Sequence, residues 1–392
     1  MSGSGWTTAP PDPRVYALVA AAGLPGTLFN PAQHRACDLV DRYAVHVAAA
    51  LLGELGLDGP LAAPSDADTL AAACGFVPRF RPALRWLLAF LAHADVLEES
   101  DGRYRLAAPL APSERAALRD AGLAADPGYA PAYALLDEAA AIYPRAARGE
   151  VAAERALFQK VSLWTAYFDN AHGYYAVNNC VAAHGAARRV GDGRVLEVGA
   201  GLGSATDALL DALAAGGTSA ALAQYRVTEP VPFFRRRAQR TLADRHAGVP
   251  LAFAALDVNA PWAAQGVAPQ SASLVWGVNV LHLARSLPRT LGEARETLVP
   301  GGWLVAGEGV RPWPGWPVAA ELPFQLLDAY VDVELDPETR PQPGFLTAEQ
   351  WRTALDRAGF VDVAFVPDVV ALRAIAPRLF PAAVCARRPN VR

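Results

Sequence analysis

The feature that most constrains the fold is a short strand that runs into a glycine-rich turn and then into a helix. The strand is predicted over 194–198, the turn reads Glu197-Val198-Gly199-Ala200-Gly201-Leu202-Gly203, and the helix is predicted over 204–215. The chain then continues with predicted helices at 233–245 and 289–298 and strands at 225–228, 251–256, 274–276, 303–306, 361–366 and 383–386. This rhythm predicts an α/β fold with a doubly wound parallel sheet, whose ligands bind beyond the carboxyl ends of the strands.

The charge and spacing of the glycine turn indicate which cofactor it suits. A nicotinamide-binding turn needs a third glycine where this chain has Ser204, and it has no need of a carboxylate at Glu197. Glu197 would repel a pyrophosphate, but it suits a ligand that carries an ammonium and a sulfonium. We therefore predict that the backbone of Gly199, Gly201 and Gly203 approaches S-adenosylmethionine closely.

Two further acids end the next two predicted strands. Glu229 follows the strand at 225–228 and is predicted to accept hydrogen bonds from a ribose diol. Asp257 follows the strand at 251–256 and, with Val258 beside it, is predicted to contact the adenine. Solvated loop carboxylates are the plain alternative. Three acids at successive strand ends, downstream of a glycine turn, nevertheless form a specific pattern.

These motifs, with 277–282 and 298–302, resemble the ordered motifs of the class I, Rossmann-like, S-adenosylmethionine-dependent methyltransferases. More closely, residues 157–309 resemble the C-methyltransferase domains of polyketide synthases. This resemblance rests on three sequence segments: Leu163-Trp164-Thr165-Ala166-Tyr167-Phe168, Thr228-Glu229-Pro230-Val231-Pro232-Phe233-Phe234 and Asn279-Val280-Leu281-His282. The amino-terminal part resembles the helical dimerisation domain of small-molecule O-methyltransferases from antibiotic pathways. Neither a carrier protein nor a ketosynthase accompanies the domain, so we expect a freestanding enzyme with a free or carrier-bound substrate.

The resemblance also implies which residues do the chemistry. In methyl transfer the protein mainly aligns the nucleophile and removes its proton, a task that suits histidine near neutral pH. The family places a catalytic histidine at the position of His282 and pairs it with an acid at the position of Glu308, so we predict a general base oriented by a carboxylate. Asn279 of the same motif is predicted to contact the cofactor. A packing histidine and a loop glutamate are the alternatives.

Aromatic residues outside these motifs are candidates for the walls of the site. Tyr167 and Tyr175 are predicted to contact the amino acid end of the cofactor, and His172 to face the substrate. Trp313 and Trp316 alternate with prolines, which suits a rigid apolar pocket for an aromatic or polyketide-like substrate. Ordinary packing explains these five residues almost as well.

The amino-terminal region predicts a second, mostly helical domain over 1–150, ahead of a cofactor-binding domain over 151–392. Helices at 32–56, 69–74 and 81–94, followed by a hairpin around Asp101-Gly102, outline a winged helix, and 107–150 reads as a helical linker. DNA binding would need a basic recognition helix. The helix at 81–94 offers only Arg81 and Arg85, which favours a dimerisation or substrate-cap domain.

Composition limits the possible partners. The 392 residues carry a net charge of −4, so nucleic acid is not an expected partner. We expect no membrane span and no secretory signal, and therefore a cytoplasmic enzyme. The scattered cysteines predict free thiols, with neither a metal site nor disulfides; they are Cys37, Cys74, Cys180 and Cys385.

The sequence therefore predicts methyl transfer to carbon or oxygen of a small natural-product substrate. A homodimer through residues 30–110 is possible. A metabolite-sensing DNA-binding regulator, and a decarboxylase or cyclase on the same fold, are the alternatives.

Overall fold

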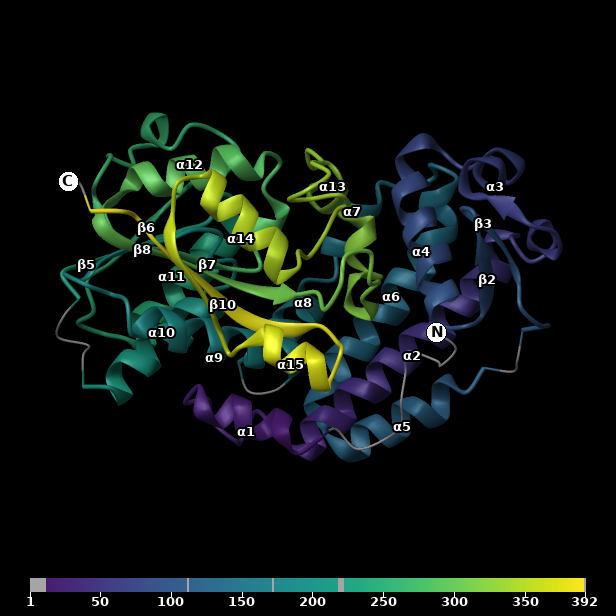
Figure 1. Ribbon diagram of the computed structural model, residues 1–392, viewed down its shortest axis with the longest axis horizontal. Coiled ribbons are helices and arrows are strands. Elements are labelled where there is room, and N and C mark those ends of the chain that lie inside the picture. Colours follow the sequence, from purple (N-terminus) through teal and green to yellow (C-terminus); the bar gives the residue numbers. More distant parts are fainter. Residues whose placement is uncertain (1–11, 111–112, 171–172, 218–221, 391–392) are drawn as a thin grey trace. The chain divides into compact units, whose positions relative to one another are not determined.

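The computed structural model contains two compact units, which we call the sheet unit and the helical unit (Figure 1). The described residues are 12–110, 113–170, 173–217 and 222–390. The sheet unit consists of Asp12–Phe29, Phe168–Pro314 and Asp332–Arg392. The helical unit, among described residues, consists of Asn30–Tyr167 and Gly315–Val331. These units differ from the predicted ranges 1–150 and 151–392 in three segments, because contacts in space and not chain order define them. The predicted domain boundary itself stays a prediction.

The sheet unit is built on a seven-stranded sheet in the order β6-β5-β4-β7-β8-β10-β9. Its strands are β4 (Arg194–Glu197), β5 (Gln224–Thr228), β6 (Leu251–Ala254), β7 (Ala272–Val278), β8 (Leu298–Val310), β9 (Val361–Val366) and β10 (Phe380–Arg387). The first five in chain order pair in parallel, whereas β10 runs antiparallel to both β8 and β9. The strand order reverses between β4 and β7, which is where ligands bind in such sheets. The predicted doubly wound fold is confirmed.

Helices cover both faces of this sheet, which explains why its central strands are apolar throughout. All seven residues of β7 are buried, as expected for a parallel strand that is covered on both sides. Figure 1 shows α9 and α10 on one side and α12 and α14 on the other. The helices of the unit are α1 (Arg14–Ala21), α9 (Gly173–Ala187), α10 (Ser204–Ala215), α11 (Pro232–Arg245), α12 (Leu287–Thr297), α14 (Ala348–Arg357) and α15 (Val369–Ile375).

Strand β8 is much longer than the predicted strand 303–306. It continues through Gly301 and Gly302 and pairs along all eight residues of β10. Glu308 therefore lies within a strand and not at its end. The parallel pairing with β7 stops at Val278 and Gly307, so Glu308 still lies just beyond the carboxyl end of β7.

The helical unit packs several helices and a small sheet around its own core. Its helices are α2 (Pro31–Leu55), α3 (Ala67–Ala73), α4 (Arg81–His93), α5 (Arg115–Ala125), α6 (Ala130–Ala147), α7 (Ala153–Phe158), α8 (Val161–Tyr167) and α13 (Asp328–Val331). Residues predicted as a linker form α5 and α6, which pack against α2. The rings of Tyr43 and Tyr133 meet edge to face at 4.9 Å, and the Tyr43 hydroxyl donates to Asp137 at 2.6 Å.

The predicted hairpin is present. Strands β2 (Leu97–Ser100) and β3 (Arg103–Leu106) pair antiparallel around Asp101 and Gly102, and β1 (Ser65–Asp66) pairs with β3. Both turn residues have positive φ, 52° and 74°, as a two-residue hairpin turn requires. The assignment of this unit as a winged helix, and its role in dimerisation, stay predictions.

The cations of helix α4 give the DNA-binding alternative no support. Arg85 donates to Asp68 of α3 at 3.0 Å, and Arg81 lies 3.8 Å from the same carboxylate. Among the described residues, no helix combines the length and the apolar character needed to cross a membrane. All four cysteines are free thiols; Cys37 and Cys385 are buried, whereas Cys74 and Cys180 are only partly so.

Candidate active site

The glycine turn lies at the carboxyl end of β4, and two of its glycines have different physical roles. Gly199 has φ +62°, and a Cβ there would lie 2.4 Å from Cγ2 of Val280, so this position requires glycine for packing. Gly201 has φ +55°, but a Cβ there would meet nothing within 4 Å. The open side of the turn, where a ligand can approach the backbone, is therefore at Gly201. Gly203, with φ +87°, ends the turn as the N-cap of α10.

Glu197 is completely buried at the end of β4, and only one of its carboxylate oxygens is satisfied. Its Oε2 accepts hydrogen bonds from the Tyr225 hydroxyl at 2.6 Å and the Thr206 hydroxyl at 2.7 Å. Its Oε1 is buried and accepts no hydrogen bond among the described residues. Burial raises the pKa of Glu197 to about 7, although the two hydroxyl donors oppose the shift. The site therefore holds a buried acceptor that a cationic donor would satisfy.

Glu229 connects the glycine turn to the start of α11. Its Oε2 accepts from the Gly201 amide at 2.9 Å and its Oε1 from the Val231 amide at 2.8 Å. Burial raises the pKa of Glu229, against the effect of these amides. Each carboxylate oxygen has a second lone pair, so these bonds leave capacity for a ribose diol. Glu229 thus also holds the turn in place, a role that the sequence did not indicate.

The other predicted cofactor residues differ in how firmly they are held. Strand β6 ends at Ala254, so Asp257 lies three residues beyond it, exposed, with Oδ1 accepting from the Asn259 amide at 2.9 Å. Val258 is half-buried and packs against the core of the sheet unit. Asn279 has φ +56°. Its backbone N–H donates to the Gly307 carbonyl, and its side-chain Oδ1 accepts from Nδ2 of Asn178 at 2.8 Å.

His282 and Glu308 meet at the carboxyl edge of the sheet. His282 lies in the short 3₁₀ turn η6 (Leu281–Leu283), and its Nδ1 is 2.6 Å from Oε2 of Glu308. The other oxygen of Glu308 accepts from the backbone amides of Leu281 at 2.9 Å and His282 at 3.3 Å. Both side chains are buried. A carboxylate accepts, so Nδ1 donates, and Nε2 is the nitrogen that carries the lone pair.

Comparison with known proteins decides what kind of domain carries this site. Residues 196–304 match the family model described as a methyltransferase domain. The chain carries a methyltransferase domain. Polyketide synthase ThaG of Burkholderia thailandensis is 32% identical over 323 residues, which are 78% of this chain and 5% of ThaG. The chain thus spans only a small part of that relative.

Solved structures show the same fold. The CurJ carbon methyltransferase aligns with a TM-score of 0.79 at 23% identity, over 96% of this chain and 97% of its own. The DszA carbon methyltransferase aligns with a TM-score of 0.75 at 24% identity, over 97% and 95%. These findings confirm the resemblance drawn from the motifs, including the S-adenosylmethionine-dependent enzyme class. The buried, unsatisfied Oε1 of Glu197 and the open face of Gly201 fit that cationic cofactor.

The aromatic candidates fall in both units, and their roles stay predictions. In the sheet unit, the ring of Tyr175 lies 4.5 Å from that of Phe168, and Trp313 is 43% exposed beneath the guanidinium of Arg373. Two candidates belong to the helical unit: Tyr167, whose ring is 6.2 Å from Trp164, and Trp316, whose ring is 4.3 Å from His93. His172 lies outside the described residues.

The sequence did not indicate several residues that support the methyltransferase site. Tyr225 and Thr206 hold Glu197, and the indole N–H of Trp276 donates to the Tyr225 hydroxyl at 3.0 Å. Arg340 and Phe345 lie against the His282 turn. A buried strand tyrosine reads as core, and no local pattern marks Arg340. Only the fold brings these side chains to the site.

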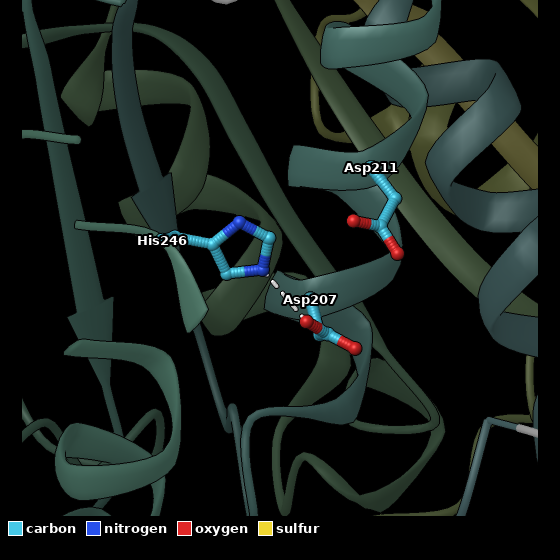
Figure 2. Close-up of side chains that lie close together, drawn as sticks. All are labelled: Asp207, Asp211 and His246. Atoms are coloured by element: carbon cyan, nitrogen blue, oxygen red, sulfur yellow. Dashed lines mark hydrogen bonds and ion pairs between the residues drawn. The ribbon is translucent and has the colours of Figure 1, made fainter. Parts of the chain in front are cut away.

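A cluster of Asp207, Asp211 and His246 lies between α10 and the end of α11 (Figure 2). The Nε2 of His246 is 2.7 Å from Asp207, and the guanidinium of Arg245 contacts Asp207 at 2.5 Å and Asp211 at 2.6 Å. Arg245 therefore already forms an ion pair with each of the two acids. We interpret the cluster as an ion-pair network that fastens α10 to α11.

Proposed function

We propose that this domain methylates carbon in a polyketide-like acyl substrate, at a position flanked by two carbonyl groups, with His282 as the base. The buried pair of His282 and Glu308 is the observation that carries the proposal. The similarity to carbon methyltransferases and to a polyketide synthase supports carbon as the acceptor. A carbon between two carbonyls is acidic enough for a histidine to deprotonate near neutral pH.

The residues of this chain divide the work between holding the cofactor and moving one proton. When bound, S-adenosylmethionine supplies an electrophilic methyl group on a sulfonium leaving group. Glu197 would accept from its ammonium, Gly201 would let it approach the backbone, and Glu229 would accept from its ribose. Asp257 and Asn279 would complete the same binding edge. All five belong to the carboxyl side of the sheet.

His282 removes the proton from the substrate carbon through Nε2. The proton converts the imidazole into an imidazolium, and the electron pair of the broken C–H bond becomes the enolate that attacks the methyl carbon. Glu308 stabilises this imidazolium because it is a carboxylate held 2.6 Å from Nδ1. Its two contacts with backbone amides keep the carboxylate oriented while the charge on the ring changes.

Methyl transfer to acetoacetyl-N-acetylcysteamine tests the proposal, with S-adenosylmethionine labelled with carbon-13 in its methyl group. We expect a product whose NMR spectrum shows the labelled methyl bonded to carbon. His282→Ala should lower turnover by about 10²-fold or more while leaving cofactor binding nearly unchanged. His246→Ala, which removes another histidine paired with a carboxylate among the described residues of this unit, should retain turnover.

Two outcomes would count against the proposal. A labelled methyl bonded to oxygen would exclude carbon as the acceptor. Full turnover in the His282→Ala variant would remove His282 from the mechanism, whatever the acceptor. Solvent deuterium exchange at the substrate carbon in the absence of cofactor gives an independent measure of the proton transfer, and it should disappear in the same variant.

A further inference from the structure

We infer that Arg340 is a positioning residue for His282: its guanidinium holds the backbone around His282, while Glu308 holds the imidazole. The inference rests on the proposed role of His282 as the base. It concerns a residue that is 58 positions away in the chain and outside every methyltransferase motif.

The guanidinium of Arg340 donates to carbonyls in and just after the turn that carries His282. Its Nη1 donates to the Ala284 carbonyl at 2.7 Å and the His282 carbonyl at 3.3 Å, and its Nη2 donates to the Arg285 carbonyl at 3.4 Å. The guanidinium is thus one donor group shared by the His282 carbonyl, within the turn η6, and by the two carbonyls of Ala284 and Arg285 that follow the turn. Arg340 satisfies them, and it thereby fixes the path of the backbone that carries His282.

Arg340 is itself held in place by a closed loop. The backbones of Asp336 and Arg340 exchange two hydrogen bonds of 2.9 Å. Inside the loop, Oδ1 of Asp336 accepts from the Thr339 amide at 2.8 Å and from the Thr339 hydroxyl at 2.9 Å. Just before it, the Glu334 amide donates to the Arg285 carbonyl at 2.7 Å. The segment is therefore fixed against the turn by its backbone as well as by the arginine.

The same segment also contacts the imidazole directly. The ring of Phe345 lies 4.6 Å from the ring of His282, at an interplanar angle of 42°. Arg311, at the end of β8, holds Phe345 in turn, because its Nε donates to the Phe345 carbonyl at 2.5 Å. The imidazole thus contacts Glu308 at Nδ1 and the tilted ring of Phe345, while Arg340 holds the backbone of His282.

A buried arginine is a costly way to fill space, which points to a specific task. Arg340 is 2% exposed, and burial lowers its pKa to about 10, so the guanidinium remains charged near neutral pH. None of the ion pairs found in the described part of the chain involves Arg340; carbonyl oxygens satisfy it. The planar fork of a guanidinium presents donors on separate nitrogens in fixed directions, whereas the ammonium of lysine is a compact group with all its donors on one nitrogen.

Steady-state kinetics of Arg340→Gln and Arg340→Lys, at a temperature where both are folded, test the inference. We expect kcat to fall by about tenfold or more in Arg340→Gln and several-fold in Arg340→Lys, because a displaced base loses alignment. The KM for the acyl substrate and the Kd for S-adenosylmethionine should change by less than about twofold. Partial loss of folding would also lower the apparent kcat at unchanged KM, so each kcat is referred to the concentration of sites that bind S-adenosylmethionine, which counts only folded enzyme.

Arg388→Gln is the matched control. Arg388 also donates through Nη1 to three carbonyls, those of Arg295, Glu296 and Leu298, but at the start of β8, away from its carboxyl end. Its replacement should lower stability and leave kcat near the wild-type value.

Each outcome decides one proposal. A wild-type kcat in Arg340→Gln would overturn the inference, provided that His282→Ala still loses turnover. If Arg340→Gln does not fold, the same result in Arg340→Lys would overturn it. An equal loss of kcat in Arg388→Gln would overturn it as well. Full turnover in His282→Ala would instead overturn the proposed function on which it rests.

Discussion

Glu197 shows how a single residue combines stability and function. A carboxylate that is fully buried with one unsatisfied oxygen destabilises the folded state whenever it is ionised. Two hydroxyl donors on Oε2 reduce this cost without removing it, and the pKa stays raised at about 7. Without cofactor, the unsatisfied acceptor oxygen of Glu197 therefore lowers the stability of the folded protein.

This arrangement predicts a stability that depends on pH. Between the unfolded pKa of about 4.5 and the folded value of about 7, the folded state holds a proton that the unfolded state has lost. The favourable contribution of Glu197 to the free energy of unfolding is complete below pH 4.5 and is lost as the pH rises through 7. Glu197→Gln, which has no proton to lose, should therefore gain stability relative to the wild type as the pH rises from 5 to 8, in denaturant unfolding without cofactor.

The measurement at pH 5 provides the internal reference for this prediction, since both folded proteins are neutral at position 197 there. A difference in unfolding free energy that is constant from pH 5 to 8 would contradict the raised pKa.

A site residue could be predicted from the sequence when its place depends on neighbouring residues in the chain, and not when it depends on distant ones. Glu197, Glu229 and His282 could be singled out from the sequence because each ends or closely follows a strand at the carboxyl edge of the sheet, and their roles stay predictions. The contacts of Tyr225 and Arg340 could not, because they depend on which strands become neighbours and on the path of a loop after α13. Neither leaves a pattern in the nearby sequence.

At the scale of elements, two glycines of the same turn serve different purposes: one allows close packing of the protein, and the other leaves space for a ligand. Gly199 is pressed against Val280, whereas Gly201 faces open space, although both have positive φ. A methyl group at Gly199 thus meets protein atoms, whereas a methyl group at Gly201 would meet a cofactor bound as we propose. The two substitutions carry a similar backbone strain of about 1 kcal/mol and differ in what the added atom contacts.

We therefore expect Gly201→Ala to fold with a modest loss of stability but to bind S-adenosylmethionine about tenfold or more weakly, a loss of roughly 1.4 kcal/mol. Gly199→Ala should lose much more stability, because the Val280 side chain must move. Calorimetric titration and thermal unfolding of both variants measure the two effects. Equal affinity for the cofactor in Gly201→Ala and the wild type would show that the cofactor does not approach this face.

The elements themselves could be predicted best where local signals and tertiary contacts agree. Helix 204–215 and strand 361–366 were predicted with the bounds observed for α10 and β9. Strand β8 was predicted too short because Pro300, Gly301 and Gly302 are turn-forming residues. Pairing with β7 and β10 overrides that local preference, and a single sequence does not show which strands will pair.

At the scale of the whole molecule, the sheet unit is discontinuous in the chain. Helix α1 precedes the helical unit in sequence, yet Val15 and Val19 are buried in the core of the sheet unit. The carbonyl of Ala22, just after α1, lies 2.8 Å from Nε2 of His184 in α9. The strand and helix rhythm starts only at residue 194, so the sequence did not reveal that α1 belongs to the sheet unit.

Val19→Asp should therefore destabilise the sheet unit by at least about 2 kcal/mol, through the loss of a buried valine and the burial of a charge. Ala20→Asp, on the exposed face of the same helix, should change stability little. Hydrogen exchange in α15, which packs against α1, reports the effect where it is expected. Unchanged exchange in α15 for Val19→Asp would show that α1 is not part of this core.

The membership of residues 12–29 in the sheet unit has a practical consequence for protein engineering. A hybrid synthase that received only residues 151–392 as a graft would lack part of the hydrophobic core of the transplanted piece. It would also carry an exposed apolar surface where α1 had been. Grafts should instead begin ahead of residue 12, so that they include helix α1 together with the sheet that it helps to cover.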